Sequence, residues 1–146
     1  MASSRDDFLM RTIQQLASAL ERAAGLRGAG DLDAAREALE NASREQFGGL
    51  ATLLPQLDVE TAVRLLASPE RMTGWVRVLA EQAEQERARG NPDAAARMDA
   101  RALELLLEAA GEQAHELPEW ARELADRVPA AAIGAAYRAR LQALRG

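Results

Sequence analysis

Residues 30–35 read Gly-Asp-Leu-Asp-Ala-Ala, and residues 90–95 read Gly-Asn-Pro-Asp-Ala-Ala. In each stretch an alanine stands seven residues before the glycine and another stands twelve residues after it: Ala23 and Ala42 in the first copy, Ala83 and Ala102 in the second. Two antiparallel helices approach closely only where their contact positions are small, and glycine permits the tight reversal between them. The two stretches therefore predict two helical hairpins, over residues 12–45 and 72–105.

The composition of the whole chain predicts an all-α fold. Of 146 residues, 33 are Ala and 21 are Leu, against 5 Val and 2 Ile. Ala and Leu are strong helix formers, whereas the β-branched residues that favour strands are scarce. We expect a single domain over residues 1–146 with seven or eight helices, comprising the two hairpins, a helical insertion over residues 48–68 and a C-terminal helical pair over residues 118–145.

Two prolines mark the expected helices of the C-terminal pair. Pro118 is expected to begin the first, which carries Trp120, and Pro129 to begin the second, which carries Tyr137. The second would include residues 130–136, Ala-Ala-Ala-Ile-Gly-Ala-Ala. Such a run of small residues permits close packing either within the domain or against a second copy of the chain, so a homodimer stays open.

The two turns, Gly30-Asp31 and Gly90-Asn91, resemble those of the tetratricopeptide repeat. In that family, helix pairs share a Gly-Asn/Asp turn and have small residues at three fixed positions. In this chain these positions are occupied by Ala23, Gly30 and Ala42 in the first copy, and by Ala83, Gly90 and Ala102 in the second. The resemblance implies repeat-like helical hairpins whose concave face binds a protein or a peptide segment. The layout of the chain is also similar to a bacterial family of small repeat-like helical proteins, a resemblance that implies no activity.

The charges of the chain argue against nucleic-acid binding. All 18 basic residues are Arg, and 23 acidic residues bring the net charge to -5. Nucleic acid is not an expected partner, because non-specific binding needs clustered positive charge and neither half of the chain is basic. The use of Arg without Lys indicates the GC-rich genome of a bacterium.

Compartment and cofactor chemistry are constrained by what the sequence lacks. There is no cysteine, which excludes disulfides and thiolate ligands. The N-terminal residues do not have the basic-then-apolar order of a signal peptide, and no apolar run approaches the ~20 residues that span a bilayer. We therefore expect a cytoplasmic protein without a membrane contact, cofactor or metal.

No catalytic arrangement stands out along the chain. His115 is the only histidine, and no second strong ligand or base is placed beside it by spacing, so we interpret it as a surface residue. Residues 25–30, Gly-Leu-Arg-Gly-Ala-Gly, superficially suggest a phosphate loop, but they close a helix rather than open one. The sequence therefore predicts a protein that is not an enzyme.

A protein-binding surface is the stronger functional candidate. The repeat register places on the concave side Ala17, Leu20, Ala24 and Arg27 in the first copy, and Arg77, Ala80, Glu84 and Arg87 in the second. We call Arg27, Arg77, Glu84 and Arg87 the arginine surface. Its guanidinium groups could bind a partner carboxylate bidentately, or they could be solubilising groups paired within the chain. Of the two tryptophans, Trp75 is expected in the core, and Trp120 is a candidate for the interface.

We expect a non-catalytic adaptor or scaffold that binds another protein. Three alternatives stay open: a nucleic-acid-associated accessory protein, an enzyme subunit whose site a partner completes, and a self-assembling structural protein.

Overall fold

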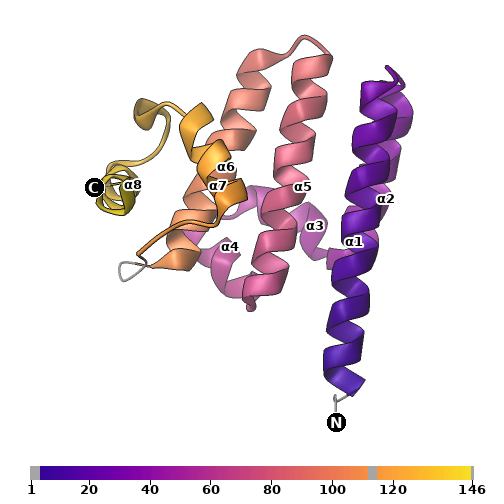
Figure 1. Cartoon of the computed structure of the whole chain (residues 1–146), viewed down its shortest axis with the longest axis horizontal. Coiled ribbons are helices and arrows are strands. Elements are labelled where there is room, and N and C mark those ends of the chain that lie inside the picture. The colour runs from indigo at the N-terminus through magenta and orange to yellow at the C-terminus, as the bar shows by residue number, and fades with distance from the viewer. Residues whose placement is uncertain (1–3, 112–114, 146) are drawn as a thin grey trace. The chain divides into compact units, whose positions relative to one another are not determined.

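The computed structural model describes residues 4–111 and 115–145 (Figure 1). Across these residues the chain is 85% helical, contains no strand and forms eight α-helices, which confirms the predicted all-α class. The chain divides into two compact units, residues 1–56 and residues 57–146. The expectation of a single domain over residues 1–146 stays a prediction.

The first unit is a long helical hairpin followed by short helical turns. It contains α1 (Ser4–Gly28), α2 (Leu32–Phe47), α3 (Leu50–Leu53) and a 3-10 turn at Leu54–Gln56. Leu16, Leu20 and Ala23 of α1 and Ala35, Leu39 and Ala42 of α2 are buried. The last turn of α2 lies beside Gln15, whose side-chain oxygen is 3.5 Å from the Gln46 amide nitrogen. Because α1 has 25 residues and α2 has 16, the N-terminal end of α1 continues past α2 (Figure 1).

The second unit is built on a second hairpin, α5 (Pro69–Ala88) and α6 (Pro92–Ala110). The preceding α4 (Val59–Leu66) packs on both of these helices, and α7 (Glu119–Arg127) and α8 (Ala135–Arg145) pack on α6. Trp75 is 3% exposed, as expected for a core residue. The two observed hairpins include the residues of the predicted hairpins, whereas the predicted insertion over residues 48–68 is divided: α3 belongs to the first unit and α4 to the second.

Both hairpins close with the same hydrogen bonds. In the first turn, Gly30 N–H donates to Arg27 O (3.0 Å) and Asp31 N–H donates to Leu26 O (2.9 Å). The equivalent bonds of the second turn measure 3.1 and 2.8 Å. Gly30 and Gly90 have φ angles of 82° and 84°, in the left-handed region. This is the Schellman arrangement, in which a left-handed residue lets the chain satisfy the last carbonyls of a helix.

The predicted start of the last helix was wrong. Pro129 begins a short 3-10 turn at Ala130–Ala132, and α8 begins only at Ala135. Between them Ile133 is extended (φ −111°, ψ 159°) and 3% exposed, and the Gly134 N–H donates to Glu104 Oε2 on α6 (3.1 Å). Burial of Ile133 and the bond to Glu104 hold this segment extended, and these tertiary contacts override the helix propensity of its alanines.

Candidate functional site

The residues of the predicted arginine surface lie in both units. Arg27 is half-buried near the end of α1 in the first unit, whereas Arg77, Glu84 and Arg87 lie on α5 in the second. Arg77 is exposed, while Glu84 and Arg87 are half-buried. The three residues of α5 therefore differ in how much of their side chains a partner could reach.

Arg87 belongs to a charge network that joins α5, α6 and α7. Its guanidinium donates to Glu84 Oε1 at 2.6 Å and to Asp99 Oδ2 at 2.7 Å. Arg127 of α7 donates to the same Glu84 oxygen at 2.9 Å, and its other terminal nitrogen lies 3.9 Å from Asp99 Oδ1. The Asp99 side chain is only 5% exposed. Two arginines and two carboxylates thus neutralise one another around a buried acid, which is the arrangement that a buried charge requires.

This network engages two residues of the arginine surface within the chain. The hydrogen bond from Arg87 to Glu84, together with the neighbouring Asp99, raises the pKa of Arg87. Sequence reasoning missed Asp99, although a signal was present. Asp99 falls at helical spacing between Ala95 and Ala102 on the apolar face of α6, where an acid needs a partner.

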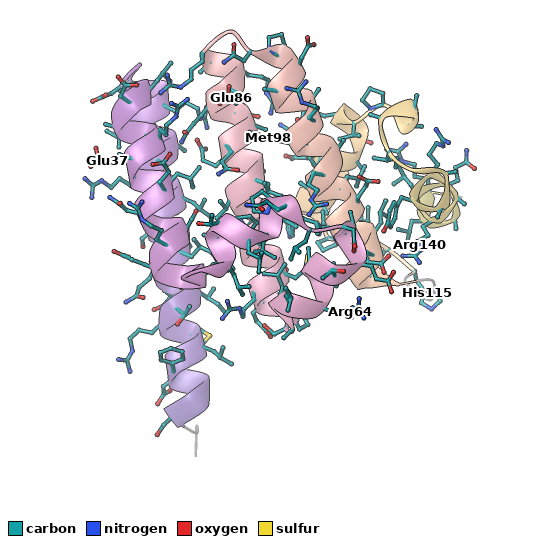
Figure 2. The ribbon with its side chains drawn as sticks, turned by 180° about the vertical axis from the view of Figure 1, so that it is seen from behind. Glu37, Arg64, Glu86, Met98, His115 and Arg140 are labelled. Carbon is teal, nitrogen blue, oxygen red and sulfur yellow. The ribbon has the colours of Figure 1, made fainter. Side chains whose placement is uncertain are left out.

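A second polar cluster docks α8 onto α6. Glu108 Oε2 accepts from the Tyr137 hydroxyl (3.2 Å) and from the Arg140 guanidinium (3.0 Å), which also lies 5.5 Å from the centre of the tyrosine ring. Arg140 is on the side of α8 that meets α6 (Figure 2). Burial, followed by the negative charge of Glu108, raises the pKa of Tyr137. These groups satisfy one another and hold the last helix in place.

An apolar hollow of about 350 Å³ lies beside Trp120, and we call it the Trp120 hollow. Its walls come from α4, from the start of α5, from the end of α6 and from the segment leading into α7, and they include Val63, Met72, Leu106, Leu117, Pro118 and Trp120. Met72, Leu106 and Leu117 are buried, whereas Trp120 is 37% exposed. Buried apolar walls beside a partly exposed indole are suited to an apolar group of a partner.

The backbone is strained at the edge of this hollow. Ala67, one of its lining residues, has φ 67° and ψ −35°, and the Ser68 N–H donates to Leu66 O across it at 2.8 Å. This three-residue turn is rare, because residues with a Cβ seldom adopt a positive φ. The turn places Ser68 at the start of α5, where its hydroxyl accepts from the Arg71 N–H (3.2 Å).

His115 lines a different, more polar hollow of about 430 Å³, together with Arg122 and Arg145. Both arginines donate to backbone carbonyls, Arg122 to Leu117 O (3.2 Å) and Arg145 to Ala125 O (2.8 Å). Among the residues that the structure describes, no group of three or more His, Asp or Glu side chains could hold a metal ion. We therefore place the candidate site at the Trp120 hollow.

Comparisons with family models, with curated proteins and with solved structures found no match for this chain. Within residues 4–111 and 115–145, no helix is both long enough and apolar enough to cross a membrane.

Proposed function

We propose that this protein is a non-catalytic interaction module that holds an apolar side chain of a protein partner in the Trp120 hollow. The observation that carries the proposal is a tryptophan 37% exposed above a floor of buried Met72, Leu106 and Leu117. Tryptophan is enriched among the residues that dominate binding energy, and such residues act best when they line a well-packed pocket.

The tetratricopeptide resemblance supports an adaptor of this kind. Both hairpins close with the same left-handed glycine and the same pair of hydrogen bonds, as expected for two copies of one structural repeat. The charged groups offer less support for a carboxylate clamp on α5. Arg87 and Glu84 already bind Asp99 and Arg127, so a partner would have to displace them.

The test is affinity capture with the full chain and with Trp120→Glu, which places a charge at the edge of the apolar hollow. Leu53→Glu is the matched control, because Leu53 is also exposed (43%) and lies in the other unit. We expect Trp120→Glu to lose the proteins retained by the wild type and Leu53→Glu to keep them, with unchanged circular dichroism for both. Retention of the same proteins by Trp120→Glu would contradict the proposal.

A third variant separates the hollow from the arginine surface. Arg77→Glu reverses an exposed charge on α5 and leaves the charge network intact. Loss of capture by Arg77→Glu alone would move the site to α5. Arg87→Glu is unsuitable for this purpose, because it would place a third carboxylate beside Glu84 and Asp99 and destabilise the fold.

A further inference from the structure

The N-terminal end of α1 exposes apolar side chains on a projecting helix. We call residues 4–13 of α1 the α1 stub. Within it Phe8 is 65% exposed, Met10 57% and Ile13 42%. The last turn of α2 lies beside Gln15, so α2 does not cover these residues (Figure 1). Several large apolar side chains gathered on one exposed helix end indicate a surface that another protein covers.

One side of the stub carries an aromatic and a basic side chain. Phe8 and Arg11 are three residues apart, so an aromatic ring and a positive charge lie on the same face of the helix. The hollow has apolar walls, and among the described residues that line it Glu116 carries the one formal charge. The Glu116 side chain is 81% exposed, and its contact with Arg122 is long at 3.7 Å. Such an exposed pair contributes little, so the Glu116 carboxylate is accessible to a partner.

We propose that the chain forms a homodimer in which the α1 stub of each copy occupies the Trp120 hollow of the other. Phe8 packs against Trp120 in an aromatic contact, and Arg11 pairs with Glu116. This inference rests on the proposed function, because it names an occupant for the same hollow. A reciprocal exchange is closed by a two-fold axis, so each contact is made twice and growth stops at two copies. The anchor is aromatic on both sides, a pairing that adds to the burial of apolar area.

The first test measures the molar mass of the full chain by size-exclusion chromatography with light scattering at micromolar concentration. We expect the mass of two chains for the wild type and for Leu53→Ser, an exposed control outside both surfaces. Phe8→Ser and Trp120→Ser, each with unchanged helicity, are expected to have the mass of one chain. A mass of one chain for the wild type would overturn the proposal, as would a dimer unaffected by both substitutions or a mass that keeps growing with concentration.

Mixing the two variants distinguishes a direct contact from an indirect effect on the fold. Phe8→Ser retains an intact hollow and Trp120→Ser retains an intact stub, so the mixture can form one of the two contacts. We expect the mixture to associate more strongly than either variant alone, although more weakly than the wild type, because it keeps one of the two contacts. Equal association of the mixture and of each separate variant at the highest concentration reached would overturn the reciprocal exchange.

A charge exchange tests the second contact. Arg11→Glu and Glu116→Arg are each expected to weaken the dimer, whereas the chain carrying both substitutions regains it. Equal weakening in all three variants would contradict a pair between these residues.

The outcome also separates this inference from the proposed function. A monomeric wild type whose capture of another protein still depends on Trp120 would refute the homodimer and leave the interaction module supported. If neither the molar mass nor the capture of another protein depends on Trp120, both the homodimer and the interaction module are refuted.

Discussion

Gly30 and Gly90 adopt backbone angles that residues with a Cβ reach only at a cost. Their φ angles are 82° and 84°, and a Cβ added at either position would have no atom within 4 Å beyond the adjacent residues of the chain. The cost of a side chain there is therefore conformational and involves no clash. Gly25 and Gly28 of α1 also have open space around them, but their φ is not positive. The glycines near the first turn thus differ in what they contribute to it.

We expect Gly30→Ala and Gly90→Ala each to lower the free energy of unfolding by ~1–2 kcal/mol, the usual penalty for a left-handed L-residue. Gly25→Ala is the matched control and should raise it by ~0.5–1 kcal/mol, because alanine is the better residue inside a helix. Denaturant unfolding of the three variants measures both effects. An unchanged midpoint for Gly30→Ala would show that the turn does not require a left-handed residue.

At the scale of elements, α8 depends on polar contacts with α6. Tyr137 and Arg140 share the Glu108 carboxylate, and Gly134 is held by Glu104. The pKa of Tyr137 is raised by burial and by the charge of Glu108. A raised pKa means that the folded state holds the phenol proton more tightly than the unfolded state does. The contribution of Tyr137 to stability is therefore complete below the ordinary tyrosine pKa of ~10 and is lost as the pH rises through the higher folded value.

Tyr137 is the only tyrosine of the chain, so tyrosinate absorbance during an alkaline titration reports its pKa directly. We expect a midpoint above ~10 in the folded protein and a return to ~10 in denaturant. Glu108→Gln should shift the folded midpoint downwards, because it removes the negative charge beside the phenol. Glu123→Gln, on the exposed side of α7, should leave the midpoint unchanged. A wild-type midpoint that is the same in buffer and in denaturant would contradict the packing of α8.

At the scale of the whole molecule, the two units differ in how much tertiary packing each has to stabilise it without the other. Residues 57–146 contain the α5–α6 hairpin with three further helices packed on it. Residues 1–56 contain one long hairpin and short helical turns. Small folds bury a lower fraction of their surface, and helices without tertiary packing are marginal in water. The second unit therefore has the larger core of its own.

We expect a fragment of residues 57–146 to remain helical and to unfold cooperatively, and a fragment of residues 1–56 to lose most of its helicity. Circular dichroism with denaturant titration of both fragments and of the full chain measures this difference. Loss of helicity in residues 57–146 would instead favour the single domain over residues 1–146 that the sequence predicted.

The sequence by itself determined the class of the fold and the positions of most helices. Its signals are local, such as Ser68-Pro69 at the start of α5 and Gly30 or Gly90 after the first helix of each hairpin. Helix formation and termination depend on residues within a few positions of one another, so one sequence contains enough information to place them. The same local reasoning failed after Pro129, where a bond to Glu104, thirty residues earlier, decides the conformation.

Only the tertiary structure decided how the candidate site is assembled. Trp120 was a candidate from the sequence, but the floor beneath it combines Met72, Leu106 and Leu117 from three separate segments. The pairing of Arg87 and Arg127 with Asp99 likewise joins three helices, and the sequence had left internal pairing of Arg87 as one of two alternatives. A hollow and a charge network depend on which helix faces meet. Which faces meet is set by helix packing across the fold, and local spacing along the chain does not specify that packing.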